Sequence, residues 1–324
     1  TRIVPAEEPD DYHDWTYTYA STLNGTDYLF QHSKTADKVN LVACQGDRFH
    51  TVLPDLRLYA DSIFPSRDWN YFVTDDALLI TGQDQYYLVN QDGISCHTFP
   101  FGTQVLGFDG KSIVTQLTTQ ENTTISCLRA LDGTAVDVYT VEQDMEGDFN
   151  RRTVRAEGYG RFYGEAGLYV LNSETGRLQQ VTGRPVLDVT TFRMDDRYII
   201  LTHDLGKRIH GPNRSGGDQI VMIEHDGTER VLLSNVPDHG IAIAGFVTSG
   251  PGSAVSFYSV EDVGMQHMNI YNYVLLPVFD PQNATKQPEI MVTGYTAGRP
   301  EMESEGYQQL YIQKEQARLD ALGY

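Results

Sequence analysis

The sequence predicts an all-β protein, a six-bladed β-propeller with a short C-terminal helix. The first observation is a unit of alternating apolar and polar residues that turns and alternates again, as in Leu168 to Thr182, LYVLNSETGRLQQVT. Variants of this unit recur at residues 40–53, 86–99, 125–141 and 220–234. The second observation is the spacing of 47, 40, 43 and 51 residues between the turn glycines Gly46, Gly93, Gly133, Gly176 and Gly227. Such a period, with no helices between the strands, is typical of propeller blades.

Each blade is expected to hold four strands, and the blades follow one another along the chain. The first begins at Trp15 and turns at Asn24-Gly25, a strong hairpin signal. The six predicted blades cover residues 15–53, 69–99, 103–141, 154–182, 187–234 and 241–295. The segment Pro54 to Asp68 has an apolar pattern of its own and is expected to form an extra strand or a short helix. A seventh blade built from this segment or from the tail is the alternative.

The last residues change character and predict a helix that starts at Pro300 and ends at Gly323. Its predicted apolar face comprises Tyr307, Leu310, Tyr311, Ile312, Leu319 and Leu322. Packing against the propeller wall and docking on a partner both remain open for this helix. The predicted organisation is a tether at 1–14, a propeller at 15–293 and a helical tail at 294–324.

Composition and charge narrow the class of partner. The chain has 324 residues and 24 basic against 44 acidic side chains, a net charge of −20. This balance argues against nucleic acid or an anionic membrane surface as the main partner. No run of 18 apolar residues occurs, so no membrane span is predicted. The oligomeric state is left open.

The cysteines and histidines give no strong metal signal. Cys44, Cys96 and Cys127 fall in strands of different predicted blades and are interpreted as buried structural thiols. We therefore predict no metal site and no cofactor, although histidines gathered on blades five and six leave metal binding or acid–base chemistry as the alternative.

The blade units resemble the propeller repeats of the TolB type and of the dipeptidyl-peptidase propellers. The resemblance is carried by an aspartate in the turn before a strand, as at Asp75-Asp76, and by hairpins such as LYVLNSETGRLQQVT. It implies the fold and not an activity, because propellers host binding modules and enzymes alike. The chain contains no G-x-S-x-G elbow, so the catalytic residues of the peptidases do not carry over.

The predicted ligand site lies in the loops that join second to third strands and outer strands to the next blade. Asp84, Glu121 and Arg184, with His203, are among the residues expected on this side. The loop from Asp204 to Gly217 is the longest connection between second and third strands, and it carries basic residues in an acidic chain. The predicted ligand-binding residues are Lys207, Arg208, His210, Arg214, His239 and His267.

These features predict a non-catalytic, extracytoplasmic binding module that contacts a protein or a glycan through loops on one side. The opening TRIVPAEEPDD is acidic, contains two prolines and is interpreted as the tether of a secreted or lipid-anchored protein. The alternative is an enzyme, a lyase or a hydrolase, with its site in a central pocket. The binding module is favoured because no nucleophile–base pair stands out, so no catalytic residue is assigned.

Overall fold

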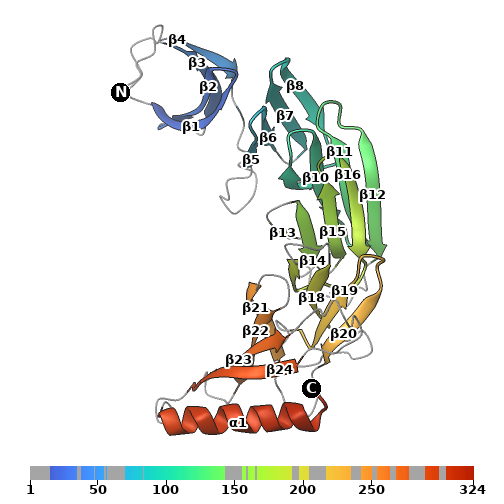
Figure 1. The fold of residues 1–324 in the computed structure, drawn as a ribbon. Helices are drawn as coiled ribbons and strands as arrows, with labels where there is room; N and C mark the ends of the chain where they lie inside the picture. Colours follow the sequence, from blue (N-terminus) through green and yellow to red (C-terminus); the bar gives the residue numbers. More distant parts are fainter. Residues whose placement is uncertain are drawn as a thin grey trace. The chain divides into compact units, whose positions relative to one another are not determined.

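The computed structural model shows a mostly β protein (Figure 1). It describes residues 15–34, 38–46, 48–54, 56, 70–82, 84–142, 155–157, 160–164, 166–191, 197–203, 217–234, 242–249, 254–262, 268–276, 289–298 and 304–324. Within these ranges, 24 strands form six four-stranded antiparallel sheets, and one helix follows them. In every sheet the strands pair in chain order, so each sheet is a meander of contiguous residues.

The strands lie where the alternation predicts them. The first three sheets contain β1 Trp15–Leu23, β2 Thr26–Ser33, β3 Val39–Gln45, β4 Arg48–Leu53, β5 Asn70–Val73, β6 Ala77–Thr81, β7 Gln85–Asn90, β8 Gly93–Thr98, β9 Gln104–Phe108, β10 Ser112–Thr118, β11 Asn122–Arg129 and β12 Ala135–Glu142. The other three contain β13 Arg155–Glu157, β14 Arg161–Gly164, β15 Gly167–Asn172, β16 Arg177–Thr182, β17 Asp188–Thr191, β18 Tyr198–Thr202, β19 Gln219–Ile223, β20 Glu229–Ser234, β21 Ala242–Ser249, β22 Val255–Asp262, β23 Met268–Leu276 and β24 Glu289–Thr296. Of the segment 54–68, only Pro54 and Leu56 are among the described residues.

Turn chemistry explains where the strands stop. Asn24 and Gly25 both have positive φ, 50° and 76°, as a two-residue hairpin with the twist of its strands requires. All five turn glycines that define the repeat also have positive φ. At Asp226 the carboxylate accepts the backbone N–H of Thr228 at 2.9 Å, and hydrogen bonds from the side chain and backbone of Thr228 hold the pKa of Asp226 below its usual value. The acidic residues of such turns are therefore structural.

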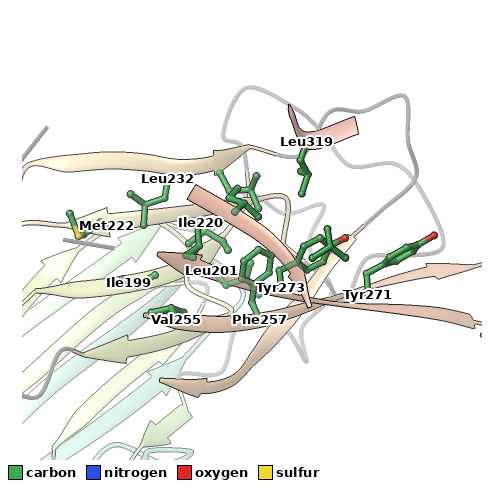
Figure 2. Packing of buried hydrophobic residues seen from close by; sticks show 14 of the residues in the cluster. Ile199, Leu201, Ile220, Met222, Leu232, Val255, Phe257, Tyr271, Tyr273 and Leu319 are labelled. Atoms are coloured by element: carbon green, nitrogen blue, oxygen red, sulfur yellow. The ribbon is translucent and has the colours of Figure 1, made fainter. Parts of the chain in front are cut away.

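The chain divides into two compact units, each with its own buried clusters. The first comprises residues 1–162 and 170–179, and the second comprises residues 163–169 and 180–324. In the first unit, Tyr86 of β7 donates its hydroxyl to the carbonyl of Ala130 at 2.9 Å, which ties the second sheet to the third. In the second unit, Figure 2 shows aliphatic and aromatic side chains of β18, β19, β20, β22 and β23 packing together with Leu319.

The C-terminal helix α1 (Glu305–Ala321) packs against the last sheet. Its N-cap is Ser304, and Gly323 follows its end with φ of +84°. Pro300, the expected start, lies outside the described residues, and β24 extends to Thr296, past the expected boundary at 293. The predicted apolar face is confirmed in part, because Tyr311, Ile312 and Leu319 pack in or against the core cluster. Leu319 is buried, but the exposed fractions of Tyr307 and Leu310 are 46% and 42%.

One cysteine was also misassigned. Cys44 and Cys127 are buried, whereas Cys96 is exposed. Cys96 lies on β8, the outer strand of its sheet, where alternate side chains face solvent. None of the three forms a disulfide bond.

Candidate functional site

Of the predicted binding loop, residues 204–217, the structure describes only Gly217, together with the residues that flank the loop on both sides. We call these flanking residues the base of the loop. Lys207, Arg208, His210, Arg214, His239 and His267 all lie outside the described residues. His203, Arg184, Asp84 and Glu121 are described, and the first two lie in the second unit. The structure therefore describes where the predicted loop leaves the fold and where it returns.

Both ends of this loop are fixed by adjacent strands. Thr202, the last residue of β18, pairs with Gln219, the first residue of β19. The hydroxyl of Thr202 is fully buried and donates to the carbonyl of Pro185 at 2.6 Å. A Cβ atom at Gly217 would come within 2.7 Å of Leu201 Cδ1 and of the carbonyl oxygen of Thr202, so only glycine fits where the loop rejoins the sheet. The described residues on both sides of the loop are therefore anchored in the sheet.

The side chain of Arg184 lies near this base and contacts two polar side chains. Its Nη1 donates to Oε1 of Gln219 at 3.1 Å, and its Nη2 lies 2.9 Å from Oε2 of Glu229. Thr182 donates to the other oxygen of Glu229 at 3.0 Å. Gln219 in turn donates from Nε2 to the hydroxyl of Ser234 at 3.0 Å. Arg184 therefore links the segment after β16 to Gln219 at the base of the loop and to Glu229 at the other end of the β19–β20 pair.

Two polar atoms in this region have unused hydrogen-bonding capacity. Nε of Arg184 and Nδ1 of His203 are buried and have no hydrogen-bond partner among the described residues. Buried polar nitrogens that lack a partner destabilise the fold, so each of them calls for an explanation. Near the base of the loop there are therefore two buried nitrogens without a described partner, although the guanidinium of Arg184 already pairs with the carboxylate of Glu229.

A related polar arrangement recurs in four sheets, each considered by itself. The side chains that face one another near the loop between second and third strands are polar in pairs: Gln31 with Asn40, Thr118 with Thr123, Thr202 with Gln219, and Glu261 with Asn269. Three of these pairs make a direct contact, at 2.9 Å for Gln31–Asn40, 3.3 Å for Thr118–Thr123 and 3.1 Å for Glu261–Asn269. The apolar core of these sheets therefore gives way to polar side chains below these loops.

Sequence reasoning missed this polar layer. Its signal is a polar residue on an inward-facing position just before or after a loop, such as Gln31 at the end of β2, which is 6% exposed. On the same predicted side of the first unit, Asp84 accepts the backbone N–H of Phe99 at 2.8 Å with its carbonyl, and Glu121 is exposed. The structure assigns neither of them to a site.

No metal centre is present in the described ranges, where no three His, Cys, Asp or Glu side chains group closely enough to hold an ion. The same part of the chain contains no helix with the length and apolar composition needed to cross a bilayer.

Comparison with known proteins gives similarity to solved structures alone. No protein-family model matches the chain, and no curated protein matches it. A dihydro-heme d1 dehydrogenase in complex with its ligand is 14% identical, with a TM-score of 0.34 over 90% of this chain and 56% of that one. A prolyl endopeptidase is 12% identical, with a TM-score of 0.32 over 88% of this chain and 48% of that one. The WD40 domain of SCAP from fission yeast, a β-propeller architecture, is 12% identical, with a TM-score of 0.28 over 89% of this chain and 77% of that one.

The chain thus spans about half the length of the dehydrogenase and of the endopeptidase. At these identities and TM-scores the similarities assign neither a family nor an activity to this chain.

Proposed function

We propose that this protein is a non-catalytic binding module whose six sheets are the blades of one β-propeller. In this proposal the loops between second and third strands receive a protein or a glycan that carries an anionic group. The longest of these loops, residues 204–217, supplies the main contacts.

The observation that carries the proposal is the network at the base of this loop. Arg184, Gln219 and Ser234 are joined by hydrogen bonds of 3.0 and 3.1 Å, and Thr202 is anchored on Pro185. A long loop held at both ends by a scaffold of paired strands is a common form of binding site.

Charge supports an anionic ligand. The loop contains Lys207, Arg208 and Arg214 in a chain of net charge −20, so it is a local exception to the acidic surface. His210, His239 and His267 are the further residues that we propose for ligand contact. Each charge-assisted hydrogen bond to a carboxylate or sulfate contributes ~1.5–3 kcal/mol.

The experiment compares two variants with the same change in net charge. Lys207→Ala/Arg208→Ala/Arg214→Ala removes the basic residues of the loop. Lys38→Ala/Arg48→Ala/Lys111→Ala removes three exposed basic residues of the first unit. Immobilised uronic-acid and sulfated oligosaccharides and an acidic peptide serve as probes at low salt. We expect the loop variant to lose at least about tenfold in affinity for the probe that binds, and the control to bind as the wild type does. Equal binding by all three proteins, or binding of no probe by the wild type, contradicts the proposal.

We also propose an extracytoplasmic location, on the ground that residues 1–11 are acidic, contain two prolines and suit a tether between an anchor and the first strand. Fractionation of cells that express the natural gene tests it. Recovery of the protein in the cytoplasm alone contradicts this part of the proposal.

A further inference from the structure

The turn between β1 and β2 consists of two exposed residues, Asn24 and Gly25. Among the described residues, Asn24 is the only one other than glycine with a positive φ, 50°, and Gly25 follows it with a φ of 76°. The residues on either side of the turn, Leu23 and Thr26, pair with each other and are buried. The turn is therefore an exposed tip on an anchored pair of strands.

The two polar groups of this turn that could react with each other are not held by hydrogen bonds. Within the described part of the chain, neither the side-chain amide of Asn24 nor the backbone N–H of Gly25 makes one. A Cβ atom at Gly25 would meet no heavy atom within 4 Å apart from those of its chain neighbours. Asparagine is a chemically labile residue, and glycine has no side chain to hinder the approach of its backbone nitrogen. The Cγ atom of Asn24 and the nitrogen of Gly25 are therefore adjacent, unhindered and open to water.

The other asparagines lack this combination. Asn24 is the only asparagine in the chain that is followed by glycine. Asn172 gives the closest comparison, because it is also exposed at a turn between two strands, β15 and β16, but is followed by Ser173. Its Oδ1 accepts the backbone N–H groups of Glu174 and Thr175, each at 3.0 Å. These two bonds form an Asx-turn that fixes the side chain of Asn172.

We propose that Asn24 is a site of covalent self-modification, where the chain converts a side-chain amide to a carboxylate. The nitrogen of Gly25 gives its proton to hydroxide and forms a bond to Cγ of Asn24. The bond between Cγ and Nδ2 breaks, and the nitrogen leaves as ammonia with a proton taken from water. Water then opens the cyclic imide, at Cγ to leave an aspartate or at the main-chain carbonyl carbon to leave an isoaspartate. The reaction consumes only water, and the proposal does not depend on the ligand proposed above.

The isoaspartate product changes the backbone of the turn. It routes the chain through the former side-chain carbonyl and so adds one carbon atom to the backbone between residues 24 and 25. A two-residue hairpin turn fits its strands only with positive φ at both central residues, a geometry that the longer backbone disturbs. Because β1 is an outermost strand of its sheet, we expect the modification to loosen the end of an edge strand at the Leu23–Thr26 pair.

The first test follows two asparagines of the folded full chain. The protein is kept at mildly alkaline pH, and mass spectrometry of peptides measures the conversion of Asn24 and of Asn172 over time. We expect Asn24 to react at least about fivefold faster, because the hydrogen bonds that hold Asn172 must break first. Asn24→Gly keeps a sequence suited to the turn and should abolish the early release of ammonia. Equal rates at the two asparagines, an intact Asn24, or unchanged ammonia release from the variant overturns the proposal.

The second test measures the effect on the hairpin. Ion exchange separates the modified protein, which carries an additional negative charge, from the unmodified protein. Hydrogen exchange at the amide of Thr26 should be about fivefold or more faster in the isoaspartate form, because the turn no longer holds the pair with Leu23. The amide of Val42, in the buried strand β3 of the same sheet, is the control and should exchange at the same rate in both forms. Equal exchange at Thr26 in both forms overturns the proposed effect on the hairpin.

Discussion

The hydroxyl of Tyr324, the last residue, accepts the backbone N–H of Ser234 at 3.0 Å and donates to the carbonyl of the same residue at 3.3 Å. Ser234 ends β20, and its own hydroxyl accepts a hydrogen bond from Gln219 at the base of the predicted binding loop. The end of α1 is therefore connected, through two residues, to the network that supports the loop.

Tyr324→Phe tests this connection. The change removes two hydrogen bonds to an outer strand and should lower the free energy of unfolding by ~1 kcal/mol. Urea unfolding measures the loss, and Tyr307→Phe, at a ring 46% exposed, is the control. If both variants unfold at the same urea concentration as the wild type, the Tyr324 contact does not stabilise the protein.

A close approach between neighbouring sheets gives the second prediction. A Cβ atom at Gly107 of β9 would lie 2.9 Å from two ring carbons of Phe162 of β14. Gly107→Ala should therefore destabilise the protein by ~1–3 kcal/mol through overpacking. The backbone of Gly107 is not in the left-handed region, so the cost comes from the contact with Phe162 and not from backbone strain. Phe162→Leu should recover part of this loss in the double variant, as measured by thermal unfolding. Additive losses would show that the two residues do not meet.

Local chemistry explains why the strands could be predicted and the network could not. Alternation and turn residues such as Asn24-Gly25 act within a few positions, so each hairpin is readable in isolation. Gln219 and Ser234 face each other across β19 and β20, but Arg184 reaches Gln219 from the segment between the fourth and fifth sheets, and no local pattern encodes that contact. The same holds for Glu315. A charged residue in a helix is usually expected to be exposed to solvent. The carboxylate of Glu315 is instead buried, where it accepts hydrogen bonds from Tyr273 and Arg318.

Alkaline pH should destabilise the protein through Tyr86. Burial, followed by the nearby charge of Asp132, raises the pKa of Tyr86 to about 12. The unfolded chain loses this proton near pH ~10 while the folded chain keeps it. The contribution of Tyr86 to the free energy of unfolding is therefore complete below that pH. It then falls by ~1.4 kcal/mol per unit as the pH rises toward the folded pKa.

The measurement is urea unfolding of the wild type and Tyr86→Phe between about pH 9 and about pH 11. The variant loses the bond to Ala130 and should start less stable, but its stability should decline less steeply. Other buried tyrosines, such as Tyr273, contribute equally to both proteins. Parallel pH profiles would contradict the assignment to Tyr86.

The three thiols should react at very different rates. Burial, followed by the charge of Asp137, raises the pKa of Cys127 to about 11, which keeps it protonated and inert. Iodoacetamide at mildly alkaline pH should label exposed Cys96 first, and label buried Cys44 and Cys127 only after unfolding. Mass spectrometry of peptides resolves the order, and early labelling of Cys127 would contradict the packing of β11.

The location of the ligand is tested most directly by hydrogen exchange with and without a bound probe. With the uronic-acid or sulfated oligosaccharide that the wild type binds, peptides covering residues 203–217 should gain protection, because the proposed ligand contacts are in this segment. Peptides of the first unit that contain Lys38, Arg48 and Lys111 should exchange as they do without the probe. Protection confined to other segments, with residues 203–217 unchanged, would contradict the account and place the binding site elsewhere.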